Sequence, residues 1–287
     1  MKTATVSNYL SLIKFSHTVF ALPFALLGFF LAVKTTETNF DWKILGLVVL
    51  CMVFARSAAM AFNRLIDTEI DKDNPRTAIR EIPAGIIGKS SALVFVILNS
   101  LFFVAATYFI NTICFYLSPV ALLVILGYSY TKRFTFLCHL VLGLGLSLAP
   151  IGSWLAVTGK FSLLPILFSF AVLFWVSGFD IIYALQDEAF DKSKGLHSIP
   201  SAIGTKNALL LSSIFHICSA AFILTAGFIG NAGMFYWIAA AIFSGLLLYQ
   251  HSLVKPNDLS KVNIAFFTTN SIASIVFATL AIADLYL

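Results

Sequence analysis

Stretches of about twenty residues with almost no acidic or basic side chain recur along this chain, and an α-helix needs that length to cross a bilayer. Hydrophobic residues make up 60% of the sequence and charged residues 11%, and amphipathic segments with a charged face are almost absent. This pattern argues against a soluble globular protein. We therefore expect an all-α, polytopic membrane protein in which residues 1–287 form a single domain around a central cavity. The nine predicted spans lie at about residues 14–33, 43–64, 90–110, 113–130, 137–157, 163–184, 207–229, 232–251 and 263–284.

Basic residues in the loops predict how these spans are oriented. They gather after the second, fourth, sixth and eighth spans and at the amino terminus, whereas the opposite side carries only Lys34, Lys43 and Lys160. The positive-inside rule therefore places the amino terminus in the cytoplasm and, after an odd number of spans, Leu287 outside. The net charge of +5 is spread over these loops, so membrane lipid is an expected partner and nucleic acid is not.

Two polar motifs interrupt the apolar pattern, and equivalent acids in them lie 120 residues apart (Asp67 to Asp187). The first motif is Asn63, Asp67 and Asp71, and the second is Asp180, Tyr183, Asp187 and Asp191. Steps of three and four residues stay on one helix face, so each motif forms a polar stripe. Because four spans separate them, both motifs are expected on the cytoplasmic side. Their similar surroundings indicate an internal repeat that pairs the helix ends near 63–71 and 183–191.

Aligned carboxylates repel one another unless a cation lies between them, and oxygen ligands suit Mg²⁺ held together with substrate phosphates. The loop after the first motif carries Arg76 and Arg80, whose guanidinium forks match phosphate oxygens, although topology alone could also account for them. Lys132 and Arg133 either reach the same cavity or extend to lipid headgroups. The sequence thus predicts a Mg²⁺–diphosphate site assembled from two helix ends.

Arg56 lies inside the second span, seven residues before Asn63 and on about the same helix face. A buried arginine there costs roughly 2.5–3.5 kcal/mol on insertion scales, so we expect it to have a partner. That partner is either an anionic group of a substrate or the carboxylate of Asp180. The five histidines show no zinc-like spacing, and only His197, after the second motif, is kept as a weak site candidate.

The two motifs resemble those of the UbiA family of membrane prenyltransferases, and the resemblance extends over nearly the whole chain. The amino-acid sequences at 17–26, 74–77 (Asn-Pro-Arg-Thr) and 82–85 (Ile-Pro-Ala-Gly) are similar to those of the 4-hydroxybenzoate polyprenyltransferase branch, especially to members assigned to menaquinone synthesis. The resemblance implies nine transmembrane helices around a cavity that binds Mg²⁺ and a polyprenyl diphosphate. One departure is that Phe190 precedes Asp191, where many relatives have a second acid.

The resemblance carries over Asn63, Asp67, Asp187 and Asp191 as metal-site residues and Lys132 as a diphosphate-binding lysine, and together with the residue patterns above it leads to the following expected roles. Metal binding is expected of Asn63, Asp67, Asp187 and Asp191; catalysis of Asp67, Asp71, Tyr183, Asp187 and Asp191; diphosphate binding of Arg76, Arg80, Lys132 and Lys192; and acceptor binding of Arg56 and Asp180. The implied reaction breaks the allylic C–O bond of the prenyl diphosphate, and the resulting cation attacks an electron-rich carbon of an aromatic hydroxy acid. A water-poor cavity that admits the lipid tail from the side would protect that cation.

This reading predicts a prenyltransferase of ubiquinone or menaquinone biosynthesis in the bacterial cytoplasmic (inner) membrane, with 4-hydroxybenzoate or a dihydroxynaphthoate as acceptor. Within the family, haem O synthase and chlorophyll synthase are alternatives that the 74–85 stretch does not favour. A CDP-alcohol phosphotransferase would need a different Asp motif. A divalent-cation or small-molecule transporter would also place carboxylates in membrane helices, but nearer the middle of the bilayer and in broken helices.

Overall fold

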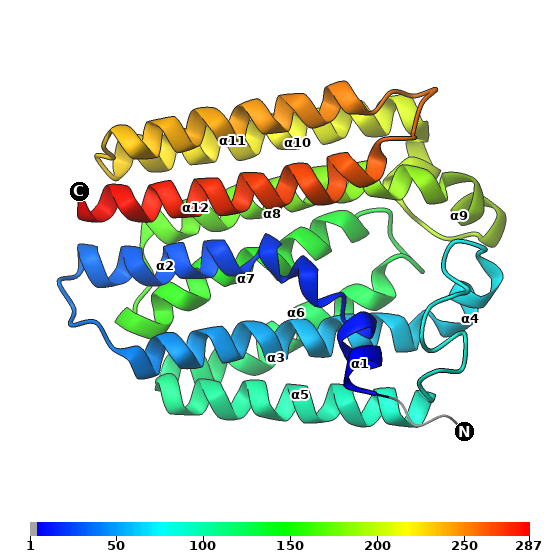
Figure 1. Cartoon of the computed structure of the whole chain (residues 1–287), viewed down its shortest axis with the longest axis horizontal. Coiled ribbons are helices and arrows are strands. Elements are labelled where there is room, and N and C mark those ends of the chain that lie inside the picture. The colour runs from blue at the N-terminus through cyan, green and yellow to red at the C-terminus, as the bar shows by residue number, and fades with distance from the viewer. Residues whose placement is uncertain (1–4) are drawn as a thin grey trace.

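The computed structural model describes residues 5–287, and over that range the chain forms helices joined by short loops (Figure 1). The elements in order are α1 (Val6–Leu12), the 3₁₀ helix η1 (Phe15–Phe20), α2 (Leu22–Thr35), α3 (Trp42–Ile66), α4 (Thr68–Asp73), α5 (Lys89–Ile110), α6 (Thr112–Thr131), α7 (Cys138–Thr158), α8 (Leu163–Ala184), the 3₁₀ helix η2 (Leu185–Asp187), α9 (Glu188–Lys194), α10 (Ile199–Ile229), α11 (Met234–Leu253), the π-helix η3 (Ile264–Thr269) and α12 (Asn270–Tyr286).

Nine helical segments within residues 5–287 are long and apolar enough to cross a membrane, which confirms the predicted fold class. Most begin and end within a few residues of the predicted bounds. The seventh is an exception, because α10 begins at Ile199 and not near residue 207. Ser198 caps the helix in a reciprocal capping box with Ser201, and Pro200 occupies its first turn, so helix starts there before the apolar run begins. A kink at Gly204, where φ is +77°, separates the polar first turns from the span.

The first predicted span is also divided. Lys14 has a left-handed backbone (φ 46°, ψ 59°), and η1 and α2 follow it as separate elements. A non-glycine residue adopts this conformation only at an energetic cost. The left-handed turn at Lys14 breaks the helical path after α1 and redirects the chain toward the bundle.

Close backbone approaches hold α7 at the centre of the packing. A Cβ atom added to Gly28 of α2 would lie 2.2 Å from the carbonyl oxygen of Pro150 in α7. One added to Gly143 of α7 would lie 2.4 Å from the carbonyl oxygen of Leu173 in α8. The hydrophobic effect does not favour association of helices within lipid, because the surrounding hydrocarbon is equally apolar. Small residues such as these glycines let the helix backbones approach closely, and van der Waals packing then holds the helices together.

A large aromatic cluster fills the space between α2, α8, α11 and α12. Trp175 is fully buried there, and Phe24, Phe243 and Phe277 pack around it with ring centroids 5.4–6.4 Å apart. Such pairs stabilise a core beyond the area they bury. This aromatic cluster packs against α8, whose end carries the second polar motif.

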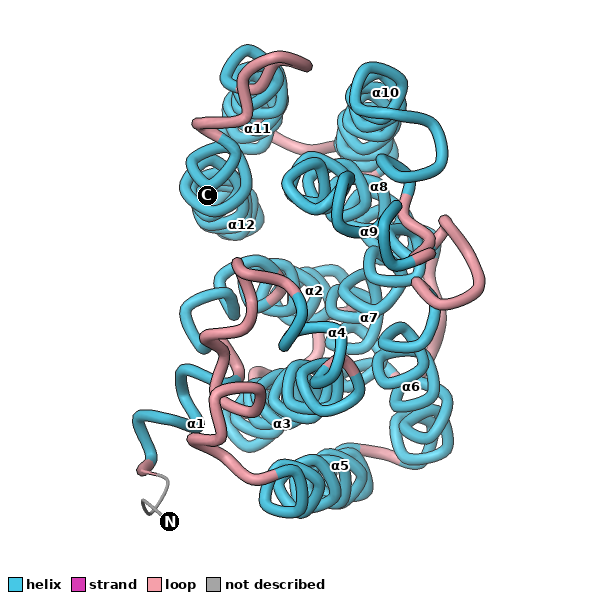
Figure 2. Tube along the Cα trace, turned by 90° about the vertical axis from the view of Figure 1, so that its right-hand side faces the viewer, coloured by secondary structure: helices cyan, strands magenta, loops and turns pink. Residues whose placement is uncertain are grey.

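The short elements α1, α4 and α9 lie together at one end of the bundle, and the carboxyl terminus lies at the other end (Figure 1). Viewed from that first end, the long helices are seen nearly end-on, and α4 lies in front of the region between α2 and α3 (Figure 2). The arrangement brings both polar motifs to the same end, as an even number of intervening spans requires.

Candidate functional site

Each polar motif lies across a break between two helices. The α3 helix ends at Ile66, Asp67 forms the junction, and α4 starts at Thr68. In the second motif α8 ends at Ala184, and η2 and α9 follow. The predicted continuous stripes are therefore wrong in detail: the chain turns at Asp67 and near Asp187. Each break leaves carboxylates at a helix end, where they can face across to the other motif.

The acids of the first motif are buried and held by basic side chains. Asp67 is 2% exposed, and its Oδ2 lies 2.6 Å from Nζ of Lys132 while its Oδ1 accepts a hydrogen bond from Nη2 of Arg133 at 3.1 Å. Both carboxylate oxygens of Asp71 accept from Nη1 of Arg80 at 2.8 Å. The amide of Asn63 donates to Oδ2 of Asp67 at 3.4 Å. Lys132 and Arg133 thus reach the site and do not extend to headgroups.

The second motif is tied to the loop that follows the first. Asp187 forms a two-pronged ion pair with Arg76, in which Nε donates to Oδ1 at 3.1 Å, and it also accepts from the amide of Asn74 at 3.1 Å. Arg76 further donates to the Tyr183 hydroxyl at 2.9 Å. Burial alone would lower the pKa of Arg76, but its bonds to Asp187 and the proximity of Tyr183 outweigh that effect and raise the pKa.

Two remaining residues of the second motif have other partners. Asp191 accepts from the Ser198 hydroxyl at 2.7 Å. Asp180 lies 2.7 Å from Nδ1 of His139, whose Nε2 accepts from the backbone N–H of Ile199 at 3.3 Å. That second contact makes Nδ1 the protonated nitrogen, so His139 donates to Asp180. No ion pair joins Asp180 to Arg56 among the described residues, and Arg56 instead donates to the carbonyl of Lys14 at 3.4 Å, so the structural partnership considered for Arg56 is not formed.

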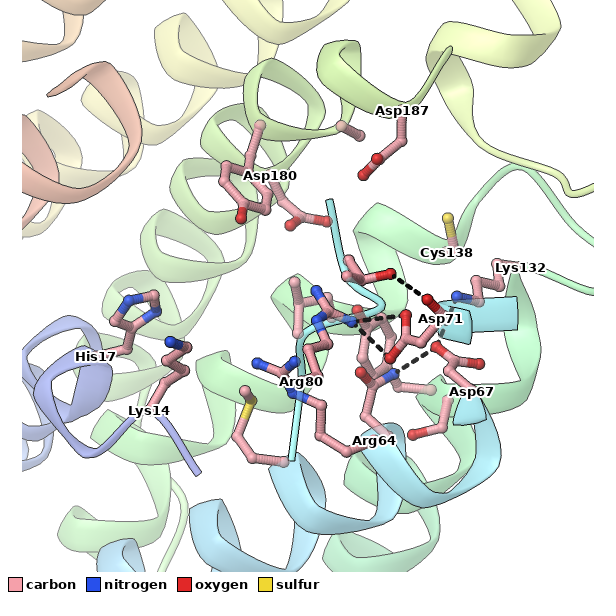
Figure 3. Close-up of a pocket in the computed structure, with 18 of the residues that line it drawn as sticks. Lys14, His17, Arg64, Asp67, Asp71, Arg80, Lys132, Cys138, Asp180 and Asp187 are labelled. Carbon is pink, nitrogen blue, oxygen red and sulfur yellow. Dashed lines mark hydrogen bonds and ion pairs between the residues drawn. The ribbon is translucent and has the colours of Figure 1, made fainter. Parts of the chain in front are cut away.

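These residues line one cavity of about 580 Å³ at the motif end of the bundle. Figure 3 shows Lys14 and His17 on one side, Asp67, Asp71 and Lys132 on the other, and Arg64 and Arg80 between them. The predicted site residues that line it are Arg56, Asn63, Asp67, Asp71, Arg76, Arg80, Lys132, Asp180, Tyr183, Asp187 and Asp191. Segments that are far apart in the sequence therefore share one polar chamber.

Two candidates lie outside that lining. Lys192 pairs with Glu188 at 2.6 Å, and its side chain is 52% exposed, because it follows Asp191 on α9 and points about 100° away around the helix. His197 is exposed, and its contribution is through the backbone: its N–H donates to the carbonyl of Lys132 at 2.7 Å. That bond ties the α9–α10 loop to the end of α6.

Sequence reasoning missed His139, Asn74 and Ser198 as partners of the motif acids. His139 and Asn74 are far in the sequence from the acids that they contact, and the end of α9 at Gly195 separates Ser198 from Asp191. Arg64 and Lys14 were also passed over, although a basic residue beside Asn63 was a visible signal. Both line the cavity.

An apolar cavity of about 400 Å³ adjoins the polar one and runs between α3, α5, α6 and α7. The two cavities share six lining residues, namely Arg56, Met60, Asn63, Tyr128, Leu142 and Leu146. Side chains such as Val48, Phe103, Leu117 and Ile151 line the rest of the apolar cavity. Space for a polar head and for a hydrocarbon chain thus meets at Arg56 and Asn63.

The acids fit a magnesium ion only in company with other ligands. In the part of the chain that the structure describes, no three His, Cys, Asp or Glu side chains converge to hold a metal ion by themselves. Mg²⁺ usually takes one or two carboxylates and completes its shell with water and substrate phosphates. The oxygen donors of Asn63, Asp67, Asp187 and Asp191 suit that mode, provided that the bases now paired with Asp67 and Asp187 turn to the phosphates.

Fold and site together define a helical membrane protein with an acid- and base-lined cavity that opens into an apolar one. Residues 21–272 match the UbiA prenyltransferase family, so the chain belongs to that family and is an integral membrane protein. It is 28% identical over 250 residues to a 4-hydroxybenzoate octaprenyltransferase of Aliivibrio fischeri, covering 86% of this chain and 85% of the relative. A Nitrosomonas eutropha protein of the same name is 29% identical over 83% of each chain.

Solved structures agree with this assignment. The apo structure of a UbiA homologue from Aeropyrum pernix K1 is 31% identical in sequence and superposes with a TM-score of 0.84, covering 93% of this chain and 98% of the other. A UbiA homologue from Archaeoglobus fulgidus bound to GPP and Mg²⁺ has a TM-score of 0.74 at 21% identity, covering 98% of this chain and 100% of the other. The second likeness concerns the fold alone.

Proposed function

We propose that this aromatic prenyltransferase moves a polyprenyl group from polyprenyl diphosphate to an aromatic hydroxy acid, with Mg²⁺, in ubiquinone or menaquinone biosynthesis. The observation that carries the proposal is the juxtaposition of the two cavities: acids and bases of both motifs line one, and hydrocarbon side chains line the other. Relatives named for 4-hydroxybenzoate prenylation support the reaction class. The site faces the cytoplasm of a bacterial inner membrane, as the loop charges favour.

In this proposal the diphosphate binds among Arg76, Arg80, Lys132 and Arg133. Asn63, Asp67, Asp187 and Asp191 would hold Mg²⁺, which would supply neutralisation of the phosphate charge and so make diphosphate a better leaving group. The four bases supply hydrogen bonds that strengthen as negative charge grows on the departing oxygen. Asp71 holds Arg80 in place for that role. Lys192, which faces solvent, remains a prediction as a fifth diphosphate ligand.

The isoprenoid tail occupies the apolar cavity. Its lining is almost entirely aliphatic and aromatic, and the shared residues Met60 and Leu146 place its mouth beside the polar chamber. The allylic carbon then lies near Arg56 and Asn63, with little water around it. Exclusion of water protects the allylic cation that forms when the C–O bond breaks.

The aromatic acceptor binds beside that carbon. Arg56 holds its carboxylate, and Asp180, fixed by His139, faces the acceptor from the opposite helix. The ring carbon attacks the allylic cation, and its proton passes to a cavity carboxylate or to the departing diphosphate. Tyr183 lines the polar cavity, and its hydroxyl, which accepts from Arg76, lies on the diphosphate side of the site; its ring stacks on Phe266 at 4.2 Å.

Mass spectrometry of the products tests this function. Purified protein, Mg²⁺ and a prenyl diphosphate are incubated with 4-hydroxybenzoate or a dihydroxynaphthoate, and the expected product is the ring-prenylated acid together with diphosphate. Omission of Mg²⁺ is expected to abolish it. Transport of labelled Mg²⁺ into liposomes without any prenylated product would replace the proposal with the transporter alternative.

A further inference from the structure

The acids of the two polar motifs differ in what surrounds their carboxylates. Four of them are each paired with a basic side chain or proposed above as a Mg²⁺ ligand, namely Asp67, Asp71, Asp187 and Asp191. Asp180 is different, because its one hydrogen-bond partner among the described side chains is the imidazole of His139. A carboxylate beside a cation is a poorer proton acceptor, since the cation stabilises its charged form. Asp180 is therefore the motif acid best suited to accept a proton.

The second oxygen of Asp180 is available to the polar cavity. His139 contacts Oδ2 at 2.7 Å, whereas Oδ1 accepts no hydrogen bond from the described residues. Both residues line the cavity, and the Asp180 side chain is 18% exposed while that of His139 is 4% exposed. Figure 3 shows Asp180 across the cavity from Arg64. Oδ1 can thus reach a group that is bound in the cavity.

His139 is fixed by the helices around it. Its Nε2 accepts from the backbone N–H of Ile199, the first residue of α10, and its carbonyl accepts from the hydroxyl of Ser177 on α8 at 3.1 Å. Because Nε2 is the acceptor, the ring is the neutral tautomer that carries its proton on Nδ1. That proton points at Asp180. His139 therefore orients the carboxylate without placing a positive charge beside it.

Asp180 also lies deeper than the residues proposed to hold the diphosphate. It precedes Asp187 by seven residues, which is about 10 Å along a helix. Arg56 precedes Asn63 by the same number of residues on α3. Arg56 and Asp180 both line the cavity below the metal motifs, on the two helices between which the acceptor ring is proposed to bind.

We propose that Asp180 is the base that removes the ring proton of the acceptor, and that His139 is the positioning residue that orients it. This inference rests on the proposed function, which leaves the proton acceptor open. Once the ring carbon has bonded to the allylic carbon, the ring is cationic and that carbon still bears its hydrogen. Oδ1 takes the hydrogen as a proton, and the C–H electron pair restores the aromatic ring. The proton then passes to the departing diphosphate, which returns Asp180 to its carboxylate form.

A deuterium isotope effect on kcat tests this role. The acid that product analysis identifies as acceptor is prepared with deuterium on the prenylated ring carbon, and kcat is measured in separate assays for the deuterated and the ordinary acid. Asp180→Asn is expected to lower kcat by about 100-fold or more, as loss of a general base implies. Its isotope effect is expected to exceed that of the wild type, because proton removal becomes the slow step. The KM for prenyl diphosphate is expected to stay unchanged.

Two substitutions of His139 separate positioning from packing. His139→Leu removes the donor to Asp180 and is expected to lower kcat by about tenfold, which corresponds to one charge-assisted hydrogen bond, and to raise the isotope effect. His139→Asn keeps an N–H donor close to the place of Nδ1 and is expected to retain most of the wild-type kcat with the wild-type isotope effect. If Asp180→Asn does not fold, His139→Leu decides alone.

His216→Leu is the matched control for loss of a buried histidine. His216 and His139 are both 3% exposed, and Nδ1 of His216 lies 2.7 Å from Nε2 of His251, but His216 lines neither cavity. His216→Leu is expected to melt at a lower temperature than the wild type and to leave the isotope effect unchanged. A raised isotope effect in both leucine variants would assign it to general loosening of the fold and would overturn the positioning role of His139.

Two results would overturn the assignment of Asp180 as the base. One is a wild-type kcat and isotope effect in folded Asp180→Asn. The other is a change confined to the KM for the acceptor, which would make Asp180 a binding residue alone. Failure of the proposed function is distinct, because the wild-type protein would then form no prenylated acid, and the inference would fail together with that function.

Discussion

Asp67 shows how a buried negative charge is balanced within the site. Its carboxylate lies between Lys132 and Arg133 and is almost completely buried. The geometry satisfies both oxygens, and removal of either partner leaves buried charge unmatched. The same residue also forms the junction between α3 and α4, so its position in the chain and its ion pairs fix one another.

Amide substitution at the motif acids tests their role without changing their size. Asp67→Asn and Asp191→Asn are each expected to reduce product formation by at least about 100-fold, because a neutral amide neither binds Mg²⁺ well nor orients the bases. Initial rates with saturating prenyl diphosphate, together with a thermal melt of each variant, measure this.

Glu69→Gln serves as the control, since Glu69 lies in the same stretch but is exposed and pairs with Lys72 and Lys89 at the surface. Exposed pairs of this kind contribute little, so activity is expected to stay within about twofold of the wild type. Near-normal rates for folded Asp67→Asn would contradict a role for the first motif.

At the residue scale the sequence predicted that the motif side chains share one cavity, but not which ones touch. Helical spacing predicted Asp187 as a site residue, and the charge of the loop after the first motif predicted Arg76. Nothing in the sequence indicates that these two residues, 111 positions apart, form an ion pair. The pairing of Asp180 with His139 depends on how α7 and α8 pack at Gly143. Lys192 lies outside the cavity lining because one residue along a helix is a turn of about 100°, and its role in diphosphate binding stays a prediction.

Between elements, the contact of α2 with α7 depends on a residue without a side chain. Gly28→Ala is expected to lower stability by about 1–3 kcal/mol, because its Cβ would lie within 2.2 Å of the Pro150 carbonyl and the backbones must move apart. Thermal melting in detergent measures the shift. Gly46→Ala in α3, where a Cβ meets nothing within 4 Å, is expected to be neutral or slightly stabilising. Equal melting temperatures for both variants would argue against close α2–α7 packing.

The apolar cavity offers a test of where the isoprenoid tail binds. Gly152 of α7 lines it and has open space around it, so Gly152→Leu is expected to fill part of the cavity and to raise the KM for a long-chain prenyl diphosphate by about tenfold. A five-carbon donor should be affected much less.

Gly127→Leu in α6 is the matched control, since Gly127 also meets nothing within 4 Å but does not line either cavity. Its KM for both donors is expected to match the wild type. If Gly152→Leu impairs long and short donors equally, the tail lies elsewhere.

The π-helix η3 was beyond what the sequence could predict. Its wide turns leave carbonyls unpaired, and the amide of Asn270 donates to those of Ala265 and Phe266 at 2.9 Å while its oxygen accepts from Trp175 at 2.7 Å. The hydropathy of this segment predicts only an uninterrupted apolar helix. The insertion nevertheless sets Phe266 against Tyr183 and so shapes the wall of the polar cavity.

For the molecule as a whole, hydropathy and loop charge carried most of the prediction. Nine spans followed from the absence of charge over helix-length windows, since a bilayer admits little else. The common end of the two motifs followed from the number of crossings. Two adjoining cavities could not be predicted in this way, because cavities depend on helix tilt and side-chain packing. The single-domain assignment and the internal repeat stay predictions.

Orientation in the membrane is testable with cysteine labelling. In a background without the four native cysteines, a cysteine introduced at Ser193 is expected to react only with reagent on the cytoplasmic side, and one introduced at Thr36 only with reagent on the outside. Both positions are exposed, and they lie at the ends of different spans. Membrane-impermeant maleimide applied to intact cells and to inverted vesicles measures this. The reverse pattern would overturn the argument from loop charge.

The two cavities share six lining residues, and at this border a polar space meets an apolar space inside the protein. An amphiphile that enters such a space orients itself as a surfactant does, with its head among charges and its tail among hydrocarbon. In the function proposed above, the bond joining head to tail lies at Arg56 and Asn63, the residues that the two cavities share, whatever the number of repeating units behind it. The reacting bond is then positioned by the partition of head and tail between the two cavities and not by the length of the tail. An enzyme with this arrangement can accept isoprenoid tails of several lengths.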